Sequence, residues 1–316
     1  MGTMTLQPVD KCEVLVLVDN YIDLLLPPKE GVLRPPLAKG NMIPEDTILA
    51  EHGLSILLRL TYGGKTHEVL MDAGYTDKVL PHNLDFLGLD LADVELVVMS
   101  HGHMDHYGGL VWAVGQIAKK PVPIVIHPDA FASPRFFKLP DGTDLLFPVM
   151  DRKAVEAAGG RFEETAEPSL QMDGHLHVTG TVERVTPFEK GMPNAYVKRG
   201  DELVHDDIFD DQGCAINVRD EGIVVISGCA HAGIINTVKY AKKLTGIDKV
   251  LGVIGGFHLS GPVFEPIIPD TIAAMKEIAP KRLVPMHCTG WTAIKAFEAA
   301  MPEAFALNAS GTTYQF

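Results

Sequence analysis

Short apolar runs and helix-spaced apolar residues alternate along the chain. Runs rich in β-branched residues predict buried strands, and they cover 12–18, 94–99, 122–126, 175–178, 183–185, 250–254 and 283–286. Apolar residues three or four positions apart predict amphipathic helices over 77–87, 110–118, 234–244, 269–278 and 292–300. Glycine-containing turns at 62–65 and 220–222 predict two hairpins. This alternation is typical of an α/β fold in which helices cover packed sheets.

The pattern favours one structural unit. No polar linker, repeat of fixed period or low-complexity tract divides residues 1–316, so we expect a single domain. Between residues 127 and 171 the periodicity weakens and prolines accumulate. We interpret the stretch 127–171 as an insertion that covers a site.

Composition narrows the classes of partner. Hydrophobic residues make up 46% of the 316 positions, enough for a sizeable core. A formal net charge of −14 repels polyanions, so nucleic acid is not expected as a partner. A local basic pocket for one small anion is compatible with this net charge, and we expect a small-molecule, anionic substrate. Nothing in the sequence indicates an oligomeric state.

Cysteine usage and the absence of long apolar stretches indicate the cellular compartment of the protein. The four cysteines are scattered and form no CxxC pair, which favours reduced thiols in a cytoplasmic protein. No signal peptide is recognisable, and no apolar stretch approaches a membrane span. We therefore expect a cytoplasmic protein without a membrane partner.

The strand at 94–99 leads directly into a cluster of metal-binding side chains, in the segment SHGHMDHYGGL (100–110). His101 and His103 are two positions apart, so their rings can converge on one ion. Asp105 and His106 follow closely enough to serve a second ion. Ligands in α/β folds bind at the carboxyl ends of strands. Packing alone gives no reason to gather three histidines and an acid there, so the segment predicts a metal site.

The HxHxDH spacing after an apolar strand resembles the metallo-β-lactamase superfamily. Three further segments resemble its motifs in the expected order, namely 71–74 (MDAG), 227–233 (SGCAHAG) and 285–288 (PMHC). The resemblance implies an αββα sandwich with two divalent metal ions at one edge of the sheets. Zinc is the expected metal, with iron and manganese as alternatives. It also implies a loop-supporting role for Asp72 and a ligand set of His101, His103, Asp105, His106 and His287.

Four more segments resemble one branch of this superfamily. They are 17–20 (LVDN), 50–55 (AEHGLS), 228–238 (GCAHAGIINTV) and 255–261 (GGFHLSG). The branch is named for 7,8-dihydropterin-6-methyl-4-(β-D-ribofuranosyl)aminobenzene-5′-phosphate synthase, an enzyme of methanopterin biosynthesis. It implies a pterin transferase in which the metal ions stabilise a pyrophosphate leaving group.

The middle of the site departs from the superfamily pattern. Most members have a bridging aspartate after a glycine, where this chain has Cys229, and no Gly-His-Thr motif precedes it. We choose His231 for the missing imidazole. Cys229 is either a thiolate ligand, since zinc lowers the pKa of a thiol, or a small buried residue. Asp211 either supplies the missing carboxylate or lies in a solvated acidic turn.

Other polar residues are expected beside the ligands. His258 follows another strand end, where it would stabilise an oxyanion or protonate a leaving group, unless it is structural. Arg184 either pairs with a phosphate through its guanidinium or forms a surface ion pair. Further residues that could support the ligands or the substrate are Asp19, Asn20, Glu51 and His52.

Three functions are compatible with these residues. The first, which we favour, is a metal-dependent hydrolase of a small phosphoester or phosphodiester, in which a dinuclear centre activates water and Asp105 helps to orient it. The second is the pterin transferase. The third is an iron-dependent redox or metal-binding protein, although no flavin domain is visible. No Ser-His-Asp elbow, Walker loop or GxGxxG motif competes for the catalytic role.

Overall fold

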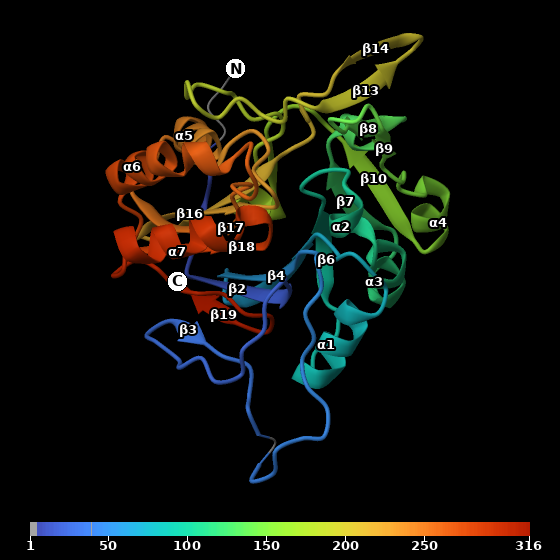
Figure 1. Cartoon of the computed structure of the whole chain (residues 1–316). Helices are drawn as coiled ribbons and strands as arrows, with labels where there is room; N and C mark the ends of the chain where they lie inside the picture. Colours follow the sequence, from blue (N-terminus) through green and yellow to red (C-terminus); the bar gives the residue numbers. More distant parts are fainter. Residues whose placement is uncertain (1–4, 39) are drawn as a thin grey trace.

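The computed structural model of the 316-residue chain describes residues 5–38 and 40–316, which form a pair of large sheets lying face to face (Figure 1). In the first sheet the strand order is β10-β7-β6-β5-β4-β2-β19-β3. Its strands are β2 (Lys11–Val18), β3 (Val32–Leu33), β4 (Ser55–Tyr62), β5 (Lys65–Met71), β6 (Val94–Val98), β7 (Val122–Ile126), β10 (Gly160–Glu164) and β19 (Thr313–Gln315).

The second sheet has the order β11-β12-β15-β16-β17-β18, with β1 paired to β15. Its strands are β1 (Pro8–Val9), β11 (Ser169–Gln171), β12 (Leu176–Val178), β15 (Gly213–Val218), β16 (Gly222–Ser227), β17 (Val250–Gly256) and β18 (Arg282–Met286). The predicted strands of both sheets are present, except that 183–185 forms no strand.

Alternating side chains give each sheet one face for its partner sheet and one for helices. In β4, Ile56 and Leu58 join the core between the sheets, whereas Leu57 joins the core on the outer face. This period of two is what a strand buried on both faces requires. The result is an αββα sandwich, which confirms the predicted fold class.

Helices cover both outer faces (Figure 1). Buried residues of α1 (Val79–Leu87), α3 (Leu110–Gln116) and α4 (Arg152–Ala157) belong to the core outside the first sheet. Residues of α5 (Ile234–Thr245), α6 (Ile268–Ile278) and α7 (Trp291–Ala300) form the core outside the second. Within residues 5–38 and 40–316, we find no helix with the length and apolarity needed to cross a membrane.

A smaller third sheet lies beside the sandwich, with the order β14-β13-β8-β9. It consists of β8 (Arg135–Lys138), β9 (Asp144–Leu146), β13 (Ala195–Arg199) and β14 (Glu202–His205). The 127–171 stretch belongs to it only partially, because β10 continues the first sheet in parallel with β7. The strands β13 and β14 were not predicted from the sequence. That residues 1–316 form a single domain stays a prediction.

Candidate metal centre

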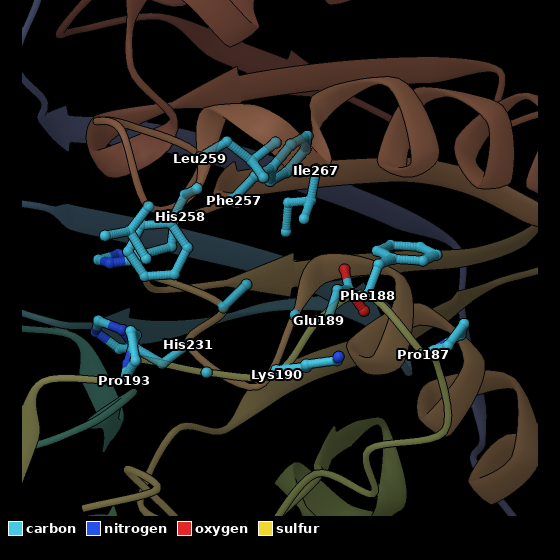
Figure 2. Close-up of a pocket in the computed structure, with 15 residues that line it drawn as sticks. Pro187, Phe188, Glu189, Lys190, Pro193, His231, Phe257, His258, Leu259 and Ile267 are labelled. Atoms are coloured by element: carbon cyan, nitrogen blue, oxygen red, sulfur yellow. The ribbon is translucent and has the colours of Figure 1, made fainter.

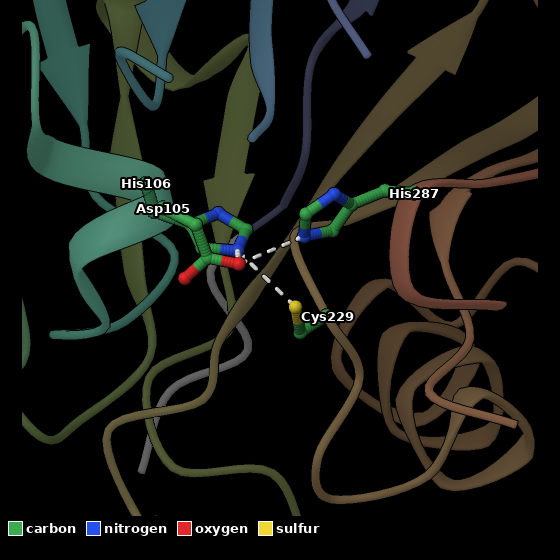
Figure 3. A group of neighbouring side chains, drawn as sticks. All are labelled: Asp105, His106, Cys229 and His287. Atoms are coloured by element: carbon green, nitrogen blue, oxygen red, sulfur yellow. Dashed lines mark hydrogen bonds and ion pairs between the residues drawn. The ribbon is translucent and has the colours of Figure 1, made fainter. Parts of the chain in front are cut away.

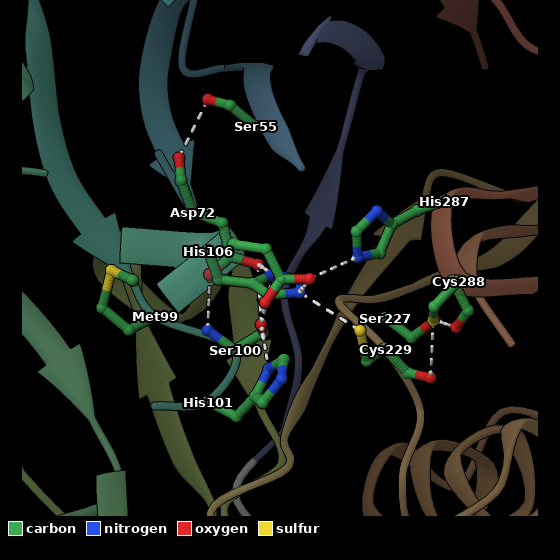
Figure 4. Close-up of polar contacts among 12 residues, drawn as sticks. Ser55, Asp72, Met99, Ser100, His101, His106, Ser227, Cys229, His287 and Cys288 are labelled. Carbon is green, nitrogen blue, oxygen red and sulfur yellow. Dashed lines mark hydrogen bonds and ion pairs between the residues drawn. The ribbon is translucent and has the colours of Figure 1, made fainter. Parts of the chain in front are cut away.

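The loops that follow β5, β6, β16 and β18 converge at one edge of the sandwich (Figure 4), and His258, from the loop after β17, lies in the same cluster. Within each sheet these strands are parallel, so their carboxyl ends share an edge. Four non-glycine residues of the loops have positive φ, namely Asp72 (59°), Ala230 (50°), His258 (47°) and His287 (52°). Such backbone strain is characteristic of functional sites.

Asp72 organises the loop that carries the HxHxDH motif. Its Oδ1 accepts the backbone N–H of Ser100 at 2.8 Å, and its Oδ2 accepts the Ser100 hydroxyl at 2.6 Å. The same Oδ2 accepts Nδ1–H of His106 at 2.7 Å, and both side chains are fully buried. Burial opposes the charged ring, but the carboxylates of Asp72 and Asp105 outweigh it and raise the pKa of His106 to about 9. The contact leaves Nε2 of His106 facing the site.

A first group of ligand atoms consists of Asp105, His106, Cys229 and His287, all within 4.8 Å of one another (Figure 3). The short helix α2 (Met104–Tyr107) carries the first two. Nε2 of His106 lies 3.1 Å from Cys229 Sγ, and Nε2 of His287 lies 3.3 Å from Asp105 Oδ2. One carboxylate, two imidazoles and one thiol thus converge on a single point.

The end of β2 holds His287 in this orientation. Nδ1–H of His287 donates to Asn20 Oδ1 at 3.1 Å, which turns Nε2 toward Asp105. Asp19 Oδ1 accepts the backbone N–H of His287 at 2.9 Å. His52 is exposed. Its Nδ1 hydrogen-bonds the side chain of Asn20, and its Nε2 lies 3.7 Å from Asp105 Oδ2. Asp19, Asn20 and His52 therefore lie beside the ligand group.

A second group consists of His101, Cys229 and His231, again within 4.8 Å. Nε2 of His101 and Nε2 of His231 are 3.2 Å apart. The ring of His103 lies 4.5 Å from that of His101 and 4.8 Å from that of His231, and its Nε2 is buried without a hydrogen-bond partner among the described residues. Burial lowers the pKa of His103 to about 3 and holds those of His101 and His231 well below their usual range. Neutral imidazole is the form that binds metal ions.

These donors fit a pair of divalent ions. Cys229 Sγ belongs to both groups, at the position where the superfamily pattern has a bridging aspartate. Burial raises the pKa of this thiol, and a bound cation would deprotonate it. A metal ion would also satisfy the orphaned Nε2 of His103. Imidazole, carboxylate and thiolate together suit zinc or iron.

Asp211 lies outside both groups. Its Oδ2 accepts the backbone N–H of Ala232 at 2.9 Å, so it supports the loop that carries Cys229 and His231. Burial raises the pKa of this carboxyl to about 7. The neighbouring Asp210 instead accepts the backbone N–H of Gly102 at 2.8 Å, inside the HxHxDH motif.

Arg135, from the small sheet, is buried against Asp210. Its Nη2 lies 2.7 Å from Asp210 Oδ1, and its Nε pairs with Asp206. Burial disfavours the charge on Arg135, but the two carboxylates outweigh this effect and raise the pKa of its guanidinium above the usual value. The small sheet is thus tied to the metal-binding loop by buried charges. This contact was not predicted from the sequence because Arg135 and Asp210 are far apart in the chain.

Two other candidates have different surroundings. Glu51 accepts the backbone N–H of Tyr75 at 2.9 Å and the hydroxyl of Thr76 at 2.8 Å, so it supports the loop after β5. Arg184 hydrogen-bonds the carbonyl of Asp207 and lies 3.9 Å from its carboxylate. It lines neither cavity at the centre.

His258 and Cys288 extend the cluster. Their ligand atoms and Cys229 Sγ lie within 4.8 Å of one another, and the ring of His258 lies 4.2 Å from that of His231. Cys288 was not predicted from the sequence, although it directly follows His287. A cavity of ≈ 200 Å³ opens over the centre, with aromatic walls from Phe137 and Phe147. Phe137 comes from the small sheet, which therefore covers one side of the site.

Comparison with known proteins agrees with this architecture. The family model described as metallo-beta-lactamase superfamily matches residues 49–190. The structure resembles that of Tm1679, a metal-dependent hydrolase of the beta-lactamase superfamily, with a TM-score of 0.71 and 23% identity over 96% of this chain and 98% of that one. With its sandwich and its ligand cluster at the strand ends, the chain belongs to the metallo-β-lactamase superfamily.

Two relatives come from Methanocaldococcus jannaschii. The chain is 32% identical to the 7,8-dihydropterin-6-methyl-4-(beta-D-ribofuranosyl)-aminobenzene-5'-phosphate synthase of that organism, over 84% of this chain and 90% of the relative. It is 31% identical to the uncharacterized protein MJ0448, over 78% of this chain and 86% of the relative. The branch recognised from short motifs is therefore also found in the whole-chain comparison.

Proposed function

We propose that this protein is a metal-dependent hydrolase that acts on a small phosphoester or phosphodiester at a dinuclear centre, with zinc as the metal. The observation that carries the proposal is that two groups of ligand atoms share the thiol of Cys229. His101, His103 and His231 would hold one ion, and Asp105, His106 and His287 the other. Two such ions, when bound, would supply a hydroxide near neutral pH and would stabilise the charge that develops on phosphate oxygens.

The remaining chemistry belongs to side chains of this chain. Burial opposes the charge on Asp105, but His106 and His287 outweigh it and lower the pKa of the carboxyl, which therefore stays ionised and can orient the attacking water. His258 lines the cavity, and its Nδ1 is buried without a hydrogen-bond partner among the described residues. We propose that His258 donates a proton to the leaving-group oxygen. Asp72 and Asn20 keep the rings of His106 and His287 in their orientations.

A second candidate is a pterin-related synthase. It is favoured by the 32% identity to the Methanocaldococcus enzyme of that name. The same centre would then stabilise a pyrophosphate leaving group, and a carbon atom of the second substrate would replace water as the nucleophile. Hydrolysis and transfer therefore differ in the attacking group rather than in the ligands.

Metal content and phosphodiester turnover separate these proposals. We expect about two equivalents of metal in the wild type, turnover of bis(p-nitrophenyl) phosphate, and loss of both in His103→Ala. His82→Ala is the matched control, because His82 bonds the carbonyl of Thr47 away from the site. Two equivalents without turnover would overturn the hydrolase and favour the synthase. One equivalent or none in metal-replete protein would contradict a dinuclear centre.

A further inference from the structure

A pocket of ≈ 490 Å³ adjoins the candidate centre (Figure 2). His231 and His258 line both this pocket and the smaller cavity over the ligands, so the two spaces are neighbours. Figure 2 shows these two histidines at one end of the pocket and Phe188 at the other. A substrate whose reacting group lies at the centre therefore has room for a second moiety in this pocket.

The walls of the pocket are mostly apolar and partly aromatic. They come from three segments: one between β12 and β13, one before α5, and one between β17 and α6. The aromatic side chains are Phe188, Phe257 and Phe264. The ring of Phe264 meets that of His258 edge to face, with centroids 4.6 Å apart and an interplanar angle of 83°. Aromatic walls favour a flat apolar ring, since stacked or edge-to-face ring pairs contribute to affinity beyond the burial of apolar surface.

One cation lies beside this apolar space, on the exposed side chain of Lys190. Lys190 lines the pocket, and no hydrogen bond or ion pair joins its ammonium to another of the described residues. The carboxylate of the adjacent Glu189 is already engaged, because it accepts the backbone N–H groups of Ile235 and Asn236 at 2.8 and 2.9 Å and the hydroxyl of Thr186 at 2.9 Å. Glu189 thus satisfies the N-terminus of α5, and Lys190 is left as the charge that a ligand can pair with.

We propose that this pocket binds an aromatic ring of the substrate and that Lys190 pairs with an anionic substituent on that ring. The proposal rests on the proposed function, because it names the moiety of the substrate that lies beside the centre. Phe264 and Lys190 are then residues that determine specificity. The phosphate itself lies at the ligands, and the ring determines which phosphate compound is bound.

The test is calorimetric binding of three phosphonates, which cannot be turned over, to the metal-loaded protein. They are methylphosphonate, phenylphosphonate and 4-carboxyphenylphosphonate. We expect the wild type to bind both aryl compounds at least tenfold more tightly than methylphosphonate. Phe264→Ala should weaken the binding of both aryl compounds about fivefold to tenfold without affecting the binding of methylphosphonate. Phe264→Leu, which keeps apolar volume, should recover some of that loss.

Lys190→Gln should weaken the binding of 4-carboxyphenylphosphonate alone, by about tenfold. Lys295→Gln, on the exposed face of α7, is the matched control and should change nothing. Equal binding of all three compounds by the wild type, or equal losses for all three in Phe264→Ala, would overturn the pocket assignment. Because no turnover is involved, ring-selective binding in a protein that hydrolyses no phosphodiester supports the pocket and rejects only the hydrolase.

Discussion

At the scale of single residues, hydrogen bonds on the far side of three imidazoles, those of His101, His106 and His287, determine how these rings are oriented. Nδ1–H of His106 donates to Asp72, and Nδ1–H of His287 donates to Asn20. His101 uses the Ser100 hydroxyl in the same way, at 3.0 Å. Each contact fixes the tautomer and leaves Nε2 for the interior of the site. The supporting residues therefore contribute to the centre without belonging to either ligand group.

Replacing Asp72 tests this arrangement. Asp72→Asn removes an anionic acceptor for Nδ1–H of His106, and we expect metal affinity to fall about 10-fold to 100-fold. The measurement is competition for zinc against a chromophoric chelator. Asp93→Asn is the control, since Asp93 is exposed on the loop before β6, at the opposite end of the strand. Unchanged affinity in a folded Asp72→Asn protein would show that the contact does not orient the ring.

At the scale of elements, the short helix α2 depends on a close approach to the loop after β5. Gly108 ends this helix, and its backbone N–H donates to the carbonyl of Gly74 at 2.8 Å. A Cβ at Gly108 would lie 1.8 Å from the backbone oxygen of Tyr75. Only glycine permits that approach, so the position of Asp105 and His106 follows from the glycine that comes after them.

Two glycine substitutions should therefore have opposite effects. Gly108→Ala should displace α2, lower the free energy of unfolding by more than about 2 kcal/mol and reduce metal content. Gly115→Ala, in the neighbouring helix α3, meets nothing within 4 Å and should raise stability by about 0.5–1 kcal/mol. Urea denaturation and elemental analysis of both variants check this. A neutral Gly108→Ala would contradict the packing argument.

Sequence patterns predicted the elements better than the contacts between them. Apolar periodicity predicted the strands and helices that flank the site because burial on both faces of a sheet leaves a strong signal. The HxHxDH cluster was visible because its members are local. Consecutive acids were ambiguous: Asp210 faces Gly102 and Arg135, whereas Asp211 faces Ala232. Which neighbour a side chain faces depends on long-range packing, which spacing along the chain does not encode.

At the scale of the whole molecule, the candidate centre lies where the two sheets meet. Its HxHxDH ligands follow β6 of the first sheet, whereas Cys229 and His287 follow β16 and β18 of the second. A bound ion would therefore connect both halves of the sandwich. Because these sites form only in the folded chain, binding free energy adds to folding stability.

Removal of metal should consequently lower the melting temperature. At a free metal concentration 100 times the dissociation constant, each site adds about 2.7 kcal/mol to the free energy of unfolding. We expect chelation to lower Tm by several degrees and re-addition of zinc to restore it, as measured by calorimetry. A variant with His106→Ala and His231→Ala should melt at one temperature with or without zinc. An unchanged wild-type Tm after verified metal loss would show that the centre does not join the halves.

The buried pairing of Arg135 bears on how molecules enter and leave the cavity. Swinging the small sheet away would separate this guanidinium from the buried Asp210, whereas Asp206, which follows β14 and hydrogen-bonds Ala195 of β13, would move with the sheet. Leaving the buried charge of Asp210 without its partner would cost about 3–5 kcal/mol, so roughly one molecule in a hundred or fewer would be open at any time. His52 and Tyr75, by contrast, line an exposed rim of the cavity. Exchange with solvent would then proceed by diffusion through a permanent mouth, and its rate would not be gated by a moving lid.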